Sequence, residues 1–336
     1  MSKDTGMDIR LVQESAPAVR FKSVQNGQYF ATSGSNGDFQ NIIEALETYA
    51  TADGGPFQMR ALWSNGMAWS GFLATNTSGI KVPADIKPGT KMGDTVNSPN
   101  VKNKQLAALL AWANVPMDKI TWVPFSDYNA TVGGLAGKID VAFAFPTSPS
   151  VLQLGNTVHY IELDPVKDPA GAERYLSVDP VTTFSKVLEG PDWLVGAMSK
   201  GSATASIVSD KADTDLVYNF VKWLDKNYAS YKDAHPQNKY MTRSIFMEFI
   251  NTTFIPVHPG TIKYLKELNL WTAANDKRQQ ANIDFLNRWI TAYQDAMKQA
   301  AAKGVSVDPS NKDWLAFWAK YKTENRLPVC KAFLGL

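Results

Sequence analysis

The sequence predicts a mixed α/β protein built on a parallel sheet, and three observations support this class. Between residues 91 and 154, short apolar runs alternate with amphipathic segments in the order strand, helix, strand, helix, strand. The connecting segments are short, which favours parallel strands joined by right-handed crossovers. The run Ile139–Phe145 (IDVAFAF) is almost continuously apolar, as strands covered on both faces are.

The pattern ahead of this region is weaker. Apolar residues alternate in Val19–Val24 (VRFKSV), which is the two-residue period of a strand. Asp38 is placed to cap a helix that begins at Phe39. We expect that helix to end near Tyr49, and we expect buried strands at Met59–Trp63 and Ala68–Ala74.

The remaining elements follow from the same two periods. We expect strands at Lys91–Val96, Ile120–Val123, Ile139–Phe145, Val158–Leu163 and Trp193–Met198, and helices at Asn103–Ala113 and Tyr128–Ala136. The rest of the chain shows the apolar spacing of amphipathic helices. These helices are predicted at Asp215–Lys226, Ser244–Ile250, Gly260–Leu268, Asn275–Lys303 and Asp313–Tyr321.

Charge and composition exclude several classes of partner. The 34 basic and 32 acidic residues leave a formal net charge of +2, which is too balanced to favour nucleic acid or an anionic membrane. No apolar run reaches the ~18 residues of a membrane-spanning helix. The charged start of the chain has no apolar core of a signal peptide.

Catalytic and metal-binding motifs are missing from the sequence. Cys330 is the single cysteine, so neither an internal disulfide nor a cysteine-based zinc site can form. His159, His235 and His258 have no metal-ligand spacing, and we expect structural roles for them. The nucleophile-elbow and phosphate-loop motifs do not occur. We therefore predict a protein that is not an enzyme and has no metal or cofactor, although a catalytic carboxylate pair stays open.

Two polar turns after predicted strands are the candidate site. The first is Asn97-Ser98-Pro99-Asn100, and the second is Pro146-Thr147-Ser148-Pro149-Ser150. In open α/β sheets, ligands bind beyond the carboxyl ends of the strands, where helix N-termini suit a carboxylate. Ser98 and Ser150 have a second interpretation, because a serine in such a turn is often only a helix cap.

Several stretches resemble one family of proteins. Asp8–Glu14 (DIRLVQE), Phe57–Trp63 (FQMRALW) and Gly137–Asp140 (GKID) are similar to its conserved segments, as is the run from Ser78 to Gly89. Ile255–Gly260 (IPVHPG) is the most specific match, and we expect His258 there to pack or cap. The family is that of the TAXI-type solute-binding subunits of tripartite ATP-independent periplasmic (TRAP) transporters.

The resemblance implies a type II periplasmic-binding-protein fold, in which two lobes close on a ligand in the cleft between them. It places the first lobe at residues 1–88 and 192–271, the second at 89–191 and a helical C-terminal extension at 272–336. It also implies a periplasmic, monomeric receptor that captures a small polar solute, such as an amino acid or another carboxylate, for a TRAP membrane transporter. The family's glycine-rich first strand has no equivalent here, and we expect the chain to lack it together with the signal peptide.

The resemblance also completes the expected ligand site. Gln25 and Asn26 would contact the solute from the first lobe, and Asn97, Ser98, Asn100, Thr147, Ser148 and Ser150 from the second. Pro99 removes a backbone N–H from its turn, so the amides of Asn97 and Asn100 would replace part of the anion cradle. Two alternatives remain on the same fold, an enzyme and a remnant that binds nothing.

Overall fold

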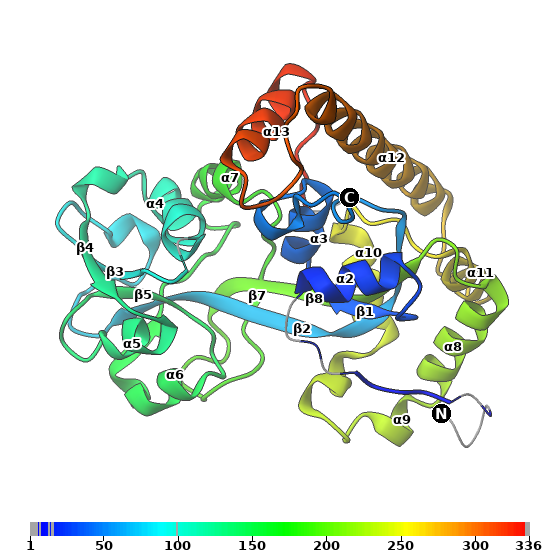
Figure 1. Ribbon diagram of the computed structural model, residues 1–336. Coiled ribbons are helices and arrows are strands. Elements are labelled where there is room, and N and C mark those ends of the chain that lie inside the picture. Colours follow the sequence, from blue (N-terminus) through cyan, green and yellow to red (C-terminus); the bar gives the residue numbers. More distant parts are fainter. Residues whose placement is uncertain (1–5, 7, 13, 15–16, 99, 333–336) are drawn as a thin grey trace. The chain divides into compact units, whose positions relative to one another are not determined.

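The computed structural model describes residues 6, 8–12, 14, 17–98 and 100–332 (Figure 1). The chain divides into two compact units, one of Met1–Met67 with Ala203–Leu336 and one of Ala68–Ser202. It passes between them twice, within strand β2 (Met59–Thr75) and within strand β8 (Met198–Ser209). The predicted mixed α/β class is confirmed, whereas the lobe boundaries after residues 88 and 191 stay a prediction. Residues 272–336 belong to the first unit.

The second unit contains the predicted parallel strands. β3 (Lys91–Thr95) pairs in parallel with both β4 (Thr121–Phe125) and β5 (Val141–Ala144). β5 and β6 (Val158–Tyr160) pair antiparallel with the second half of β2, and β7 (Phe184–Lys186) pairs antiparallel with the start of β8. The parallel register puts the carboxyl ends of β3, β4 and β5 at one edge of the sheet.

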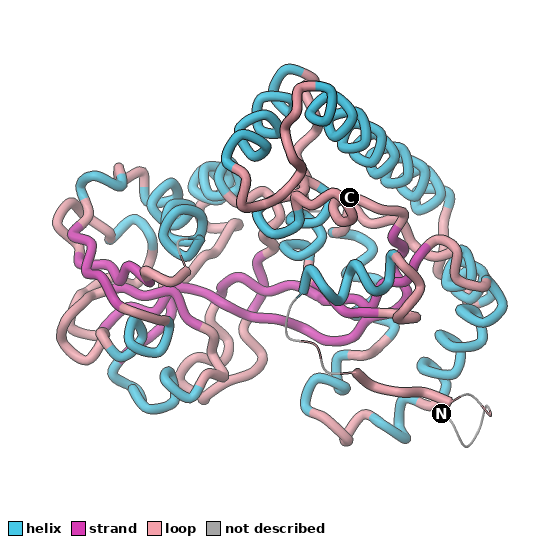
Figure 2. The backbone as a smooth tube through the Cα atoms, in the orientation of Figure 1, coloured by secondary structure: helices cyan, strands magenta, loops and turns pink. Residues whose placement is uncertain are grey.

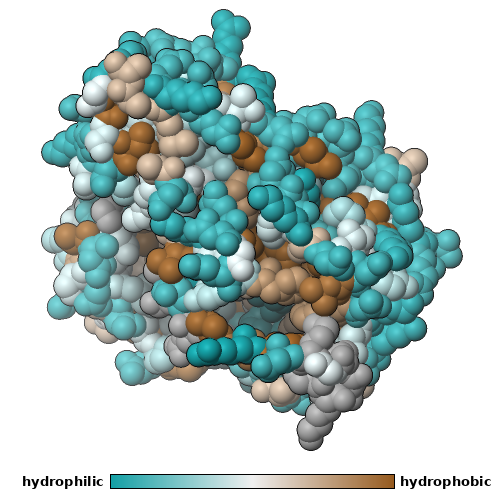
Figure 3. Space-filling view, turned by 45° about the vertical axis from the view of Figure 1, so that its right-hand side comes forward, coloured by the Kyte–Doolittle hydropathy of each residue, from teal (hydrophilic) through white to brown (hydrophobic). Residues whose placement is uncertain are grey.

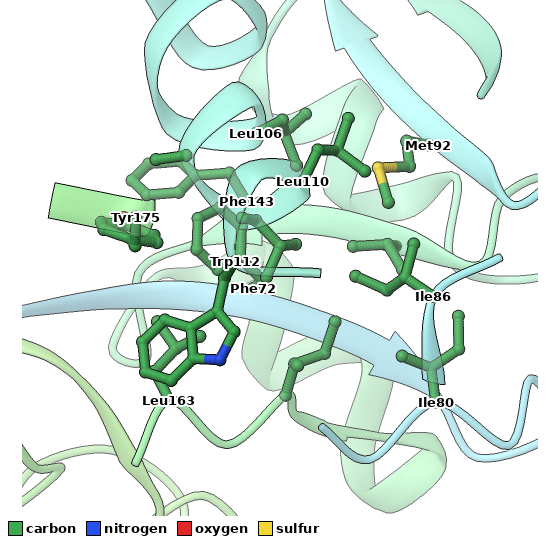
Figure 4. Packing of buried hydrophobic residues seen from close by; sticks show 14 of the residues in the cluster. Phe72, Ile80, Ile86, Met92, Leu106, Leu110, Trp112, Phe143, Leu163 and Tyr175 are labelled. Atoms are coloured by element: carbon green, nitrogen blue, oxygen red, sulfur yellow. The ribbon is translucent and has the colours of Figure 1, made fainter. Parts of the chain in front are cut away.

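Helices cover both faces of these strands. A π-helical segment, Val101–Leu106, leads into α4 (Ala107–Ala113), which packs against α7 (Pro169–Val178). Figure 1 shows α4 and α5 (Tyr128–Gly133) on opposite faces of the strands, and α5 packs against α6 (Pro149–Leu154). Figure 4 shows the buried cluster under α4, which contains Phe72, Leu106, Trp112, Phe143 and Tyr175.

The first unit consists mainly of helices, as Figure 2 shows. Its short β1 (Thr32–Gly34) pairs antiparallel with the end of β8. Its helices are α2 (Pro17–Gln25), α3 (Asn36–Ile43), α8 (Thr214–Lys226), α9 (Tyr228–Tyr231), α10 (Arg243–Thr252), α11 (Pro259–Glu267), α12 (Ala273–Ala302) and α13 (Lys312–Glu324). The predicted helices from Asp215 onward are therefore confirmed to within a few residues at each end.

Two predicted strands are wrong. Val19–Val24 lies in helix α2, where Phe21 and Val24 are buried three residues apart and Val19 is exposed. Trp193–Ala197 forms turns, and the strand begins only at Met198. That strand, β8, buries alternate small residues along its length, and it was missed because Gly, Ser, Ala and Thr give a weak strand signal.

Other boundaries differ in detail. The two expected strands at Met59–Trp63 and Ala68–Ala74 are one continuous strand, β2. Helix α3 begins earlier than expected because Ser35 is its cap, and Asp38 accepts a hydrogen bond from the Ser35 backbone in a capping box. The helix predicted at Asn103–Ala113 begins instead as the π-helical segment.

Hydrophilic side chains cover most of the face that Figure 3 shows. Figure 3 shows a face on which hydrophilic residues predominate and hydrophobic residues form small groups. Within the described part of the chain, no helix combines the length and the hydrophobicity that crossing a bilayer requires.

Candidate anion-binding site

The two polar turns predicted from the sequence follow neighbouring strands. Met92 of β3 lies opposite Val141 of β5 in the parallel register, and Val96 and Phe145 directly follow the ends of these two strands. The turns after β3 and β5 therefore start at the same edge of the sheet, where ligands of open α/β sheets bind. That they bind a ligand stays a prediction.

The first turn leaves its polar side chains accessible. Asn97, Ser98 and Asn100 are exposed, and no hydrogen bond of their side chains is recorded within the described residues. The Ser98 backbone N–H donates to the Thr95 carbonyl at 2.9 Å, and Asn100 precedes the π-helical segment without a side-chain cap. Ser98 and Asn100 are thus available to a ligand, whereas Pro99 lies outside the described residues.

The second turn uses its serines internally. The Ser148 hydroxyl lies 3.0 Å from the Tyr128 hydroxyl and 3.3 Å from the Ser150 hydroxyl, and it donates to the Phe145 carbonyl at 3.1 Å. Tyr128 also accepts a hydrogen bond from the Phe145 backbone N–H at 2.9 Å. Ser150 is buried, and Thr147 is exposed. The serines therefore hold the turn in shape, and Thr147 is the accessible donor.

Gln25 and Asn26 lie in the first unit, at and just after the end of α2. Gln25 is half-buried and lines a cavity of about 120 Å³ together with Phe21 and Ile42, and Asn26 is exposed. Because the other six predicted site residues belong to the second unit, the proposal that all eight contact one ligand stays a prediction.

A buried basic cluster lies beside this edge and was missed by the sequence reasoning. We define it as Lys104, Asp179 and Lys200, all in the second unit. The Asp179 carboxylate lies 3.2 Å from the Lys104 ammonium and 3.1 Å from the Lys200 ammonium, and it accepts a hydrogen bond from Thr182 at 2.8 Å. The side chain of Asp179 is 3% exposed and that of Lys200 is 12% exposed. Two ammonium groups thus lie beside one buried carboxylate.

Burial and charge pairing set the electrostatics of the cluster. Burial would raise the pKa of the Asp179 carboxyl, but the charges of Lys200 and Lys104 outweigh it, and the pKa falls below its ordinary value. Burial lowers the pKa of the Lys200 ammonium, and the attraction of Asp179 only partly opposes this shift. The Lys200 ammonium also donates a hydrogen bond to the Gln105 side-chain oxygen.

The cluster connects with the predicted turns through two elements. Lys104 lies four residues after Asn100 along the helical segment, and residues at this spacing share one side of a helix. The Lys200 ammonium lies 5.9 Å from the ring centre of Phe143, and that ring is 5.2 Å from the ring of Phe145 at the strand end. Lys200 lies at a partly exposed position of β8, between buried Ser199 and Gly201, and its partners in the cluster are far away in the sequence.

A larger cavity lies at the opposite edge of the same strands. Its volume is about 480 Å³, and its lining includes Thr75, Lys91, Lys138, Asp140 and Thr157. The Asp140 carboxylate accepts a hydrogen bond from the Lys91 backbone N–H at 2.8 Å, which ties the starts of β3 and β5 together. None of the predicted site residues lines this cavity.

The three histidines have structural roles, as predicted. His258 is buried and caps α11, accepting from the Gly260 N–H at 3.1 Å, and its other ring nitrogen lies 3.2 Å from the Ala212 carbonyl. Burial lowers the pKa of His258, which favours the neutral ring. His159 bonds Asn76 and Ile80, and His235 caps a short 3₁₀ turn. The described residues contain no cluster of metal-ligating side chains.

The features above define a two-unit α/β protein with a candidate site for a small anion. A model of the family described as NMT1/THI5 like matches residues 3–205, and one described as NMT1-like family matches residues 196–268. The chain belongs to the NMT1/THI5-like family. No curated protein sequence matches it.

Solved structures show distant similarity. The periplasmic aliphatic sulphonate binding protein SsuA from Escherichia coli has 11% identity and a TM-score of 0.40 over 96% of this chain and 80% of that one. Rpa4515 of R. palustris, solved with adipate, has 11% identity and a TM-score of 0.41 over 84% and 88%. The desulfurization enzyme DszB has 14% identity and a TM-score of 0.34 over 88% and 86%. At this distance, neither ligand nor activity transfers to this chain.

Proposed function

We propose that this chain is an extracytoplasmic solute receptor that captures a small organic anion and delivers it to a membrane transporter. The observation that carries the proposal is the basic cluster, in which the ammonium groups of Lys104 and Lys200 lie 3.2 Å and 3.1 Å from the Asp179 carboxylate. An ammonium group that is largely shielded from water attracts an anion more strongly than one in bulk solvent.

The surrounding groups suit a carboxylate ligand. Charge-assisted hydrogen bonds from an ammonium to a carboxylate are among the stronger ones in proteins. Lys104 and Lys200 would supply the charge, and the exposed side chains of Asn97, Ser98, Asn100 and Thr147 would supply neutral donors at the same edge. Ser148 and Ser150 would act indirectly, by holding the second turn.

The proposed transporter is of the TRAP type, with this chain as its TAXI-like subunit. Support comes from the sequence stretches similar to that family, above all Ile255–Gly260. We further propose that the receptor works as a monomer outside the cytoplasm. An ABC-type transporter is the alternative partner, and co-expression with each class of membrane subunit, followed by uptake of the identified solute, would distinguish the two.

We propose binding without catalysis. The side chains most suited to nucleophilic or acid–base work are occupied elsewhere, since His258 and His159 bond backbone carbonyls and Cys330 is fully buried in the first unit. An enzyme on this fold is the second candidate. It would be supported if an anion that binds were recovered chemically changed, as measured by mass spectrometry after prolonged incubation.

Thermal denaturation with a panel of carboxylates and sulfonates tests the receptor. A ligand at one hundred times its Kd adds about 2.7 kcal/mol, which raises Tm by roughly 5 °C or more. The rise should fall to about half or less in Lys200→Met at the same ligand concentration and persist in Lys138→Met, a matched change at an exposed lysine in the same unit. If no anion raises Tm of a monomeric, cooperatively melting sample, the receptor function is wrong and the remnant interpretation gains support.

A further inference from the structure

We propose that a cavity in the first unit binds a small uncharged molecule with an apolar body, such as a single aromatic ring. The cavity has a volume of about 120 Å³, and its two main walls are helix α2 and residues 48–57. Every described residue that lines it belongs to the first unit, so the cavity is separate from the basic cluster and from the two polar turns. The inference therefore goes beyond the proposed receptor function and does not depend on it.

Apolar side chains make up most of the lining. Phe21, Ile42 and Phe57 are buried, and they line the cavity together with Ala18 and Val19. An apolar ligand gains free energy when it leaves water for such surroundings. An apolar cavity of about 150 Å³ takes benzene. A cavity of about 120 Å³ therefore suits one ring or a short branched alkyl group.

The charged side chains of the lining are paired with one another. Among the described residues that line the cavity, Lys22 and Asp53 carry the charges, and they form an ion pair. The Thr51 hydroxyl also donates a hydrogen bond to the Asp53 carboxylate at 3.3 Å. An ionised ligand would lose its hydration without gaining an unpaired counter-charge, which is costly. The cavity should therefore select uncharged molecules.

Both walls are held in place by contacts with the rest of the first unit. On α2, the ring of Phe21 packs edge-to-face against that of Phe39, with 6.1 Å between the ring centres. Trp314 of α13 and Tyr293 of α12 each donate a hydrogen bond of 2.8 Å to a backbone carbonyl of residues 50–51. Walls that are already ordered lose little conformational entropy when a ligand binds.

The cavity is accessible from solvent. Val19, Thr48 and Asp53 line it and are exposed, and the exposed fraction of Val19 is 46%. A ligand can therefore enter without unfolding of α2. Its apolar body would contact the buried side chains, and a single polar group could remain in water at the opening.

Filling the cavity from α2 tests whether the space is available. Ala18 lines it, and Ala18→Leu adds three carbon atoms on that side while it keeps a strong helix former. We expect the urea midpoint of Ala18→Leu to equal or exceed that of the wild type. Ala319→Leu, at an exposed position of α13 in the same unit, is the matched control. A lower midpoint or a failure to fold in Ala18→Leu alone would show overpacking and would overturn the inference.

Thermal denaturation of the full chain with three matched probes tests binding and selectivity. Benzyl alcohol, benzoate and benzylammonium share the ring and differ in charge. At ten times its Kd, benzyl alcohol should raise Tm by about 3 °C or more in the wild type and in Ala319→Leu. This rise should be lost in Ala18→Leu, whose added side chain occupies the space. The part of the rise that Ala18→Leu removes measures binding in the cavity, and for benzoate and benzylammonium it should correspond to an affinity at least about tenfold weaker.

The remaining outcomes separate this inference from the receptor function. The inference is overturned if benzyl alcohol causes no rise up to its solubility, or if the rise persists in folded Ala18→Leu. It is also overturned if either charged probe binds in the cavity as tightly as benzyl alcohol. None of these results affects the receptor, whose test depends on Lys200 in the second unit.

Discussion

Changing Asp179 and changing Lys200 should change the stability of the protein by different amounts. Asp179→Asn removes the anion of the basic cluster and leaves two ammonium groups 3.2 Å and 3.1 Å from a neutral amide. Lys200→Met keeps a side chain of similar length over Phe143 and Tyr175, and Lys104 still pairs with Asp179.

The magnitudes follow from burial. Removing one partner of a buried ion pair costs about 3–5 kcal/mol, because the remaining charge is left uncompensated. Asp179 is 2% exposed, so that range applies to Asp179→Asn with little reduction for solvent screening. Lys200→Met leaves Asp179 paired with Lys104 and removes the desolvation cost of the Lys200 ammonium, and we expect the free energy of unfolding to change by less than about 1 kcal/mol.

Urea unfolding at pH 7, followed by circular dichroism, measures both changes. The transition of the second unit is the relevant one if the two units unfold separately. The reasoning is refuted if Asp179→Asn costs less than about 1 kcal/mol, or if Lys200→Met costs as much as Asp179→Asn. Lys138→Met is the control for a lysine-to-methionine change at an exposed position of this unit.

Three further outcomes are expected. Because the pKa of Asp179 is lowered on folding, its stabilising contribution is present above the ordinary pKa of 3.8 and is lost as pH falls through the lower folded-state pKa. Below pH 4, the urea midpoint of the wild type should therefore decrease more steeply with decreasing pH than that of Asp179→Asn. His258→Ala should lower the unfolding free energy by about 1–3 kcal/mol and leave anion affinity unchanged, since it removes a cap and a buried hydrogen bond; unaltered stability would contradict the assigned role. Gly55→Ala should lower the free energy of unfolding by about 2–4 kcal/mol, because φ is +77° and the added Cβ would lie 2.7 Å from the Tyr293 ring. Gly89→Ala, where φ is +88° and no atom lies near the added Cβ, should lower it by only about 1 kcal/mol. Equal losses of stability in the two variants, measured by calorimetry, would contradict a steric clash with Tyr293.

The parallel strands and their turns were predictable because their signals are local. β5 buries all four of its residues, and β3 and β4 are short runs separated by a clear amphipathic helical segment. The order of these elements then sets the carboxyl ends of neighbouring strands at one edge. Local periodicity was sufficient for this part of the fold and for the position of the two turns.

The two errors arose where local signals were ambiguous. In Val19–Val24 six residues fit both periods, and only tertiary burial of Phe21 and Val24 decides for a helix. In β8, the buried residues before Ile207 are small, so their hydrophobicity predicts a strand only weakly. Pairing with β1 and β7, which the sequence does not reveal, holds these residues in a strand.

The basic cluster could not be derived from the sequence because its members come from three elements. Lys104 lies in the π-helical segment, Asp179 follows α7, and Lys200 lies on β8. Each looks like an ordinary charged residue in its own segment, and only the fold brings the three together. The turns predicted from the sequence contain neutral hydrogen-bond donors. The two lysines that add positive charge belong to no recognisable sequence motif.

Capture of an organic anion by the basic cluster is tested most directly by isothermal titration calorimetry of a binding anion against three proteins. The wild type and Lys138→Met should bind it with the same Kd. Lys200→Met should bind it about 10- to 100-fold more weakly, which corresponds to the loss of one charge-assisted hydrogen bond. An unchanged Kd in folded Lys200→Met would contradict the proposed site.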